Sequence, residues 1–122
     1  MDNFQFKRSD RVAQQIQDII SNIIATKVIV QGLGLATVTK VKTSQNLRFS
    51  RIYLSFMGNS IPPEELIILM NRNIKEYRYH LGKDLQIKYV PQIKFYHDNT
   101  LEEMEKISNL INKSKKNEKK AD

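Results

Sequence analysis

The stretch LGKDLQIKYVPQIKFYHDNT, residues 81–100, decides the fold of this chain. Its apolar residues alternate with polar ones, which is the period of a half-buried strand. They are Leu85, Ile87, Tyr89, Ile93 and Phe95. Pro91 falls inside the pattern, where it cannot donate a hydrogen bond to a neighbouring strand. We therefore expect a strand over residues 86–96 that is interrupted at Pro91 or turns its backbone outward there, with Lys88 and Lys94 on its exposed side.

The segment before this stretch predicts a long helix with a kink or break inside it. Two prolines and two glutamates at residues 62–65 suit the first turn of a helix. Apolar residues then recur on one helical face, at Met70, Ile74, Tyr77 and Leu81. Asn71 and Asn73 are poor helix formers, and Gly82 weakens the helix further.

The residues after the stretch predict a closing helix and a tail. Thr100 and Glu103 have the spacing of a capping box. The apolar face of the helix would consist of Leu101, Met104, Ile107 and Leu110, and the helix would end near Ile111. Residues 112–122 hold five lysines against two acids and no large apolar side chain, so we expect a disordered basic tail.

The N-terminus predicts an amphipathic helix. Ser9 is placed to cap it, with Asp10 in the first turn, and the helix would run to about Ala25. Its apolar face would consist of Val12, Ile16, Ile19, Ile20 and Ile23.

Two strands are expected next, after a loop. The run TKVIVQGLG, residues 26–34, contains two glycines and indicates the loop. The runs LATVTKVKTS and LRFSRIYLSFMG, residues 35–44 and 47–58, are rich in β-branched and aromatic residues. The turn TSQN lies between them, so we expect an antiparallel hairpin.

The expected order is helix, strand, strand, helix, strand, helix, which is an α+β fold. The length of 122 residues suits a single domain, here over residues 1–111, followed by the tail. With only three strands, helices would cover one face of the sheet and leave the other partly open.

Composition narrows the class of function. The net charge is +7, of which the tail supplies +3, and the isoelectric point is about 9.7. A polyanionic partner is therefore expected, nucleic acid first and a membrane surface second. There is no cysteine, hence no disulfide or thiolate metal site. No signal peptide or membrane span is evident, so we expect a cytoplasmic protein.

Three ordered runs resemble the ribosome-binding factor A family. The run RVAQQIQDIISNII, residues 11–24, is similar to the opening helix of that family. The run TVTKVKTSQNLRFSRIYLSFMG, residues 37–58, is similar to its hairpin. The most distinctive is HLGKDLQIKYVPQIKFYHDNTLEEMEKISNLI, residues 80–111, with its Y-x-P-x-I-x-F strand. The resemblance covers about residues 9–111.

This resemblance implies a single KH-like domain of type II, in the order helix, strand, strand, helix, helix, strand. It also implies a non-enzymatic factor of ribosome biogenesis. Such a factor binds the free, immature small (30S) subunit, assists late maturation and processing of 16S rRNA, leaves before translation, and is associated with cold adaptation. We expect it to act as a monomer.

Two departures from the family pattern stand out. The usual A-x-G or S-x-G kink is replaced by Asn73, Ile74 and Lys75. The usual aspartate of the hairpin turn is Asn46, which can make the same local hydrogen bond. Ordinary KH domains also grip nucleotides with a G-x-x-G loop between two helices, and this chain has none there. We therefore expect charged surface to make the RNA contacts, reading shape and phosphates.

The candidate RNA-binding residues are the basic side chains expected on exposed positions. They are Lys7, Arg8, Arg11, Arg48, Arg51, Arg72, Lys75, Arg78, Lys83, Lys88 and Lys94. Tyr53, Tyr79 and Tyr96 alternate with basic residues and offer stacking surfaces, although a half-buried packing role is the more ordinary reading.

Other chemistries lack support in the sequence. His80 and His97 are the only histidines, and they make a poor metal site without further ligands. No nucleophile, base and orienting group stand together, so we expect neither an enzyme nor a cofactor. The alternatives to a ribosome assembly factor are a general RNA-binding KH-like domain and a protein-interaction module. The interaction module would dock through the apolar loop KVIVQGLGL, residues 27–35, and the hairpin edge.

Overall fold

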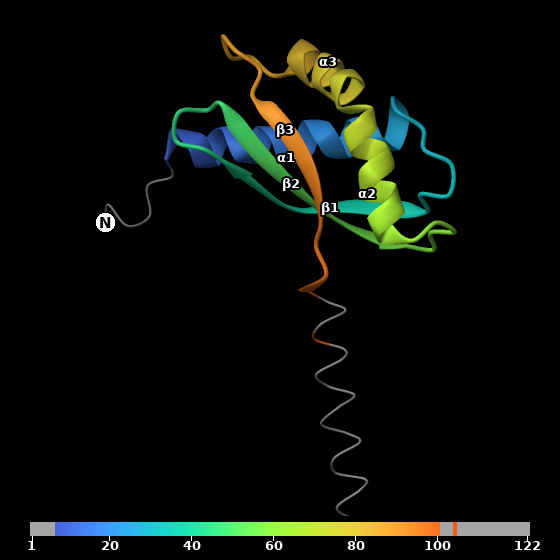
Figure 1. The fold of residues 1–122 in the computed structure, drawn as a ribbon. Coiled ribbons are helices and arrows are strands. Elements are labelled where there is room, and N and C mark those ends of the chain that lie inside the picture. Colours follow the sequence, from blue (N-terminus) through green and yellow to red (C-terminus); the bar gives the residue numbers. More distant parts are fainter. Residues whose placement is uncertain (1–6, 101–103, 105–122) are drawn as a thin grey trace, which may run out of the picture.

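The computed structural model describes residues 7–100 and residue 104 (Figure 1). Its elements follow the expected α+β order. They are α1 (Arg8–Thr26), β1 (Leu35–Thr43), β2 (Phe49–Met57), α2 (Pro63–Arg72), α3 (Ile74–Asp84) and β3 (Gln92–His97). The closing helix, the capping box of Thr100 with Glu103, and the tail lie outside the described residues.

The three strands form one sheet in the order β1-β2-β3. β1 and β2 are antiparallel, as the hairpin requires, whereas β2 and β3 are parallel. Parallel neighbours need a crossover connection, and α2 and α3 supply it. Figure 1 shows α1 running along the sheet, with α3 near it and α2 beside β3.

The helices cover one face of the sheet and enclose the core. Alternate residues of the strands point into it, including Ile52, Leu54 and Phe95, which are fully buried. They join Ile16 and Ile20 of α1 in one cluster. The residues between them on the strands stay exposed or half-buried. The expectation of a sheet with one open face is therefore confirmed.

α1 begins two residues earlier than the sequence suggests. Lys7, and not Ser9, is the N-cap residue, because the carboxylate of Asp10 accepts a hydrogen bond from the Lys7 backbone N–H at 3.3 Å. That bond satisfies one of the free amide groups at the helix start. Ser9 is buried within the first turn. The prediction that Ser9 caps this helix is thus wrong.

The hairpin turn is held by Ser44 and Asn46. The Asn46 side-chain oxygen accepts hydrogen bonds from the Ser44 hydroxyl at 2.7 Å and from the Arg48 N–H at 3.1 Å. The expectation that asparagine makes the local bond of the family aspartate is confirmed. Farther along β1, the register with β2 shifts at Thr39, which has no partner in the pairing and forms a bulge.

The long helical segment breaks at Asn73. The Asn73 N–H bonds to the Met70 carbonyl at 3.1 Å and closes α2, while the Asn73 carbonyl accepts the Glu76 N–H at 3.0 Å and opens α3. The predicted break is confirmed. Met70, Tyr77 and Leu81 are fully buried, as their helical spacing indicates.

β3 begins at Gln92, so the expected strand over residues 86–96 is wrong in its first half. Pro91 is buried just before the strand and has no N–H that could hydrogen-bond to a neighbouring strand. The carbonyl groups of Val90 and Pro91 accept hydrogen bonds from the Arg78 guanidinium, at 3.0 and 3.1 Å. Residues 85–91 therefore form a loop tied to α3, and Lys88 lies on that loop and not beside Lys94 on a strand.

Both outer strands receive an amide side chain from a helix. Asn71 of α2 donates to the Phe95 carbonyl at 3.0 Å and accepts from the Phe95 N–H at 2.9 Å. It thus bonds to β3 as a further strand would. At the opposite edge of the sheet, Gln17 of α1 donates to the Val38 carbonyl of β1 at 3.1 Å, beside the bulge.

Candidate nucleic-acid interface

The open face of the sheet carries a row of cations. Arg51 on the central strand is paired with Lys42 on β1 and with Lys94 on β3. All three side chains are exposed, because their positions alternate with the buried ones. Three positive charges from three strands therefore lie side by side.

A row of aromatic rings lies next to these cations. Tyr53 and Tyr96 are adjacent in register, and their rings stack with centroids 5.4 Å apart. The Lys40 ammonium lies 4.5 Å from the Tyr53 centroid, and that of Lys94 lies 5.4 Å from the Tyr96 centroid. Both tyrosines are half-buried, so they pack on the sheet and expose part of each ring.

One acidic side chain borders this face. Hydrogen bonds from the side chain of Thr100, then from Thr39 and the Thr100 backbone, lower the pKa of Asp98 from 3.8 to about 2, and the charge of Lys40 contributes a smaller part of this shift. The Thr39 hydroxyl donates to the Asp98 carboxylate at 2.6 Å. The Asp98 carboxylate thus accepts hydrogen bonds from Thr39 and Thr100 at the end of β3.

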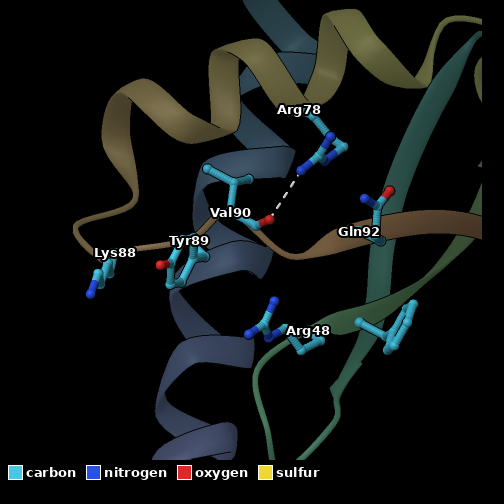
Figure 2. Close-up of a pocket in the computed structure, with 7 residues that line it drawn as sticks. Arg48, Arg78, Lys88, Tyr89, Val90 and Gln92 are labelled. Carbon is cyan, nitrogen blue, oxygen red and sulfur yellow. Dashed lines mark hydrogen bonds between the residues drawn. The ribbon is translucent and has the colours of Figure 1, made fainter.

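At the other end of β3 a hollow opens between the loop 85–91 and the start of β2 (Figure 2). Its lining residues are Arg48, Phe49, Arg78, Lys88, Tyr89, Val90 and Gln92. The Arg48 guanidinium and the Lys88 ammonium lie 5.3 and 5.4 Å from the Tyr89 ring centroid. We call this the Tyr89 hollow. A neighbouring hollow shares Arg48, Lys88 and Tyr89 and adds Arg8 from the start of α1.

The hollow and the open sheet face are continuous. A third depression is lined by Phe49 and Gln92, which also line the Tyr89 hollow, and by Arg51, Lys94 and Tyr96 of the sheet. We call the joined surface the basic face. Its cations are Lys40, Lys42, Arg48, Arg51, Lys88 and Lys94.

The structure separates the predicted candidates into groups. Arg8, Arg48, Arg51, Lys88 and Lys94 lie on or beside the basic face. Arg78 lines the hollow, but its guanidinium is occupied by the loop carbonyls.

The other candidates lie on helices. Arg72, Lys75 and Lys83 are exposed along α2 and α3, on positions away from the buried stripe. The Lys83 ammonium lies 4.5 Å from the ring centroid of Tyr79, which is 61% exposed and lies outside the core. Lys7 and Arg11 are exposed at the start of α1.

Sequence reasoning missed Lys40, Lys42 and Tyr89. The alternation in TKVKT, residues 39–43, with Val41 pointing inward, carries the signal for the two lysines. Val38 also points inward, because the bulge at Thr39 shifts the register between Val38 and Lys40. The strand pattern places Tyr89 among the inward-facing apolar residues, whereas its side chain is 58% exposed.

Two kinds of feature are absent from the part of the chain that the structure describes, a metal-binding cluster and a helix that could span a membrane. Over residues 7–100, no three histidine, cysteine or acidic side chains come together in a way that could hold a metal ion. Across the same residues, no helix combines the length and apolar character that a bilayer crossing needs.

The fold and its surface define a class. A three-stranded sheet with this order of helices is a KH-like domain. Only Asn73 separates α2 from α3, which leaves no room for a nucleotide-gripping loop between them. The molecule is a KH-like domain with a cluster of basic residues on its open sheet face and in a loop hollow.

Comparisons with known proteins identify the family. Residues 8–111 match the family model described as "Ribosome-binding factor A". The chain is 33% identical over 109 residues to ribosome-binding factor A of Vibrio campbellii, covering 88% of this chain and 80% of that protein. It is 33% identical over 108 residues to the Vibrio vulnificus protein, covering 87% and 82%. This chain belongs to the ribosome-binding factor A family.

Solved structures agree on the fold. The crystal structure of ribosome-binding factor A from Thermus thermophilus superposes with a TM-score of 0.65 at 16% identity, covering 73% of this chain and 93% of that one. A homology model of the Thermus thermophilus factor, fitted into a cryo-EM map of its complex with the 30S subunit, gives a TM-score of 0.59 at 16% identity, covering 70% and 90%.

Proposed function

We propose that this protein binds the free small ribosomal subunit and assists the late maturation of 16S rRNA without catalysing a reaction itself. The observation that carries the proposal is the basic face, on which six cations from all three strands, the hairpin turn and the loop 85–91 surround partly exposed aromatic rings. Family membership supports the ribosome as the target, and the 30S complex of the Thermus thermophilus relative supports the small subunit. The protein would act in the cytoplasm as a monomer.

The mechanism is selective binding. Lysine and arginine side chains on a broad face pair with phosphates and recognise the shape of folded RNA, with little reading of sequence. A factor of this kind stabilises the rRNA arrangement that it binds best, and the shift is limited by its difference in affinity for the two arrangements. Maturation would then remove the preferred arrangement and release the factor.

The test is co-sedimentation of the purified protein with small subunits, large subunits and whole ribosomes across a salt series. About six phosphate contacts predict an affinity loss of roughly 10³-fold between 50 and 200 mM salt. Salt-sensitive binding that is selective for small subunits is the expected result. Equal binding to all three particles would reduce the function to general affinity for polyanions.

Two variants of equal charge tell the candidate surfaces apart. Lys42→Gln with Arg51→Gln and Lys94→Gln removes three charges from the basic face. Arg72→Gln with Lys75→Gln and Lys83→Gln removes three charges from α2 and α3. We expect the first variant to lower the salt slope by about three and the second to leave it near that of the wild type. The opposite result would move the interface to the helices.

The alternative function, a protein-interaction module, rests on an apolar cluster at the opposite end of the hairpin. Ile29 is 87% exposed, and Leu35 and its strand partner Met57 are also largely exposed. Ile29→Ser with Leu35→Ser would abolish subunit binding in that case, and the binding would hardly respond to salt. We expect this variant to bind small subunits like the wild type.

A further inference from the structure

We propose that the Tyr89 hollow receives one unpaired nucleotide of RNA, whose base stacks on the Tyr89 ring. This inference deepens the proposed function, because it gives the basic face a site for a single base in addition to its contacts with phosphates. Figure 2 shows Tyr89 and Gln92 on opposite sides of the hollow, with Arg48 and Arg78 between them.

The loop that carries Tyr89 is anchored to α3, whereas the Tyr89 side chain is not part of the core. Arg78 donates to the carbonyls of Val90 and Pro91, the two residues that follow it, and Pro91 is buried. A Cβ atom at Gly82 of α3 would come within 3.1 Å of a Val90 methyl group, so the helix and the loop pack closely there. The ring nevertheless remains 58% exposed. A fixed loop thus presents an open aromatic surface, which a stacking site requires.

The charges around the ring suit a nucleotide. Arg48 and Lys88 lie within 5.4 Å of the ring centroid, and Arg8 lines the adjoining hollow. Among the described residues, no acidic side chain lines either hollow. A base on the ring would therefore bring its phosphate within reach of long, flexible cations.

The hollow favours an unpaired base over a duplex. Bases in a helix are stacked on one another, and only splayed bases of loops, bulges or ends can stack on a side chain. The exposed Gln92 side chain carries both a donor and an acceptor, so it can bond to the edge of any base. The site would consequently show little sequence preference, in contrast to a clamp that reads particular bases.

A tryptophan reporter tests the stacking directly. The chain contains no tryptophan, so Tyr89→Trp introduces a single fluorophore into the hollow. Tyr79→Trp is the matched control: Tyr79 is 61% exposed and has the Lys83 ammonium 4.5 Å from its centroid, but it lies on α3 and does not line the hollow. Both variants are titrated with single-stranded oligoadenylate and with an RNA duplex of the same length. We expect strong quenching by the single strand at position 89 only.

Affinity measurements complete the test. Tyr89→Leu should lower the affinity for the single strand by about 5- to 150-fold, the range measured for loss of one stacked base. Tyr89→Phe keeps the ring and should bind like the wild type. Thermal melting of each variant checks that the fold is intact. Equal quenching at positions 79 and 89, or unchanged affinity in Tyr89→Leu, would overturn the inference.

Failure of this inference is distinguishable from failure of the proposed function. If Tyr89→Leu and the wild type both sediment with small subunits and neither stacks a base, only the inference fails. If the wild type stacks oligoadenylate but does not select small subunits, the inference stands and the proposed function fails.

Discussion

The hydrogen bonds of the Asn71 side chain should make a measurable contribution to the free energy of unfolding. This residue makes two hydrogen bonds to the backbone of Phe95, at 2.9 and 3.0 Å, in a partly buried position. Each bond of this kind contributes about 1 kcal/mol net. Asn71→Ala removes both, which costs about 2 kcal/mol, and gains roughly 0.5 kcal/mol of helix propensity. The expected net loss in the free energy of unfolding is about 1.5 kcal/mol.

Urea denaturation followed by circular dichroism measures this loss. Asn22→Ala is the matched control, because Asn22 is an exposed residue of α1 and the substitution changes helix propensity alone. The difference between the two variants then isolates the Phe95 bonds at about 2 kcal/mol, or a melting temperature lower by roughly 8–16 °C. If Asn71→Ala matched Asn22→Ala, with the same dependence on urea, the reasoning would be refuted.

Asn71→Asp refines the same test. A carboxylate can still accept the Phe95 N–H but cannot donate to the Phe95 carbonyl, whereas a protonated carboxyl can do both. The folded state therefore raises the pKa of the introduced carboxyl above its unfolded value of about 3.9. Its stabilising contribution is fully present below that value and is lost as the pH rises through the folded-state pKa. Asn71→Asp should approach wild-type stability near pH 3 and fall below Asn71→Ala near pH 7.

Three further predictions concern single residues. Burial, then the nearby Glu76, raises the pKa of Tyr77 from 10.0 to about 12, and its hydroxyl lacks a hydrogen-bond partner among the described residues. Tyr77→Phe should stabilise the protein by about 1 kcal/mol in urea titrations. The wild type should lose stability as the pH rises from about 10 to about 12, and this loss should be absent in Tyr77→Phe. The pKa of Asp98 is lowered from 3.8 to about 2, so stability is lost as the pH falls through that window, and Asp98→Asn should flatten this acid dependence. Gly34 has a φ of +66°, and a Cβ there would collide with the Met57 carbonyl, so Gly34→Ala should lower the free energy of unfolding by about 2 kcal/mol or more in the same titrations.

Local signals in the sequence predict most of the fold. The hairpin and α1 follow from patterns within about twenty residues, and the break at Asn73 follows from poor helix formers beside a continuous apolar stripe. The start of β3 does not follow, because Leu85 and Ile87 continue the alternation of a strand while Arg78, on another element, binds the carbonyls at Val90 and Pro91. A tertiary contact thus overrides a local period.

The sequence predicts that the interface is basic, but it does not predict which basic residues lie together on one surface. Lys42, Arg51 and Lys94 are brought into one row by strand register, including a parallel pairing that no single segment encodes. The face that Lys75 and Lys83 occupy depends on how α3 packs against α1. The local period places Tyr89 on a strand, whereas the hydrogen bonds from Arg78 hold residues 85–91 as a loop on which Tyr89 is exposed.

The hydrogen bonds that the side-chain amides of Asn71 and Gln17 make to the two outer strands limit how this protein can associate with other chains. A bare strand edge is a template on which another chain can add, by partner binding or by aggregation. Here Asn71 occupies the outward groups of Phe95 on β3, and Gln17 with the bulge at Thr39 interrupts the edge of β1. The sheet is therefore closed to extension at the middle of both edges, so that an incoming molecule meets its flat, charged face and copies of the chain have little means of joining into a larger sheet.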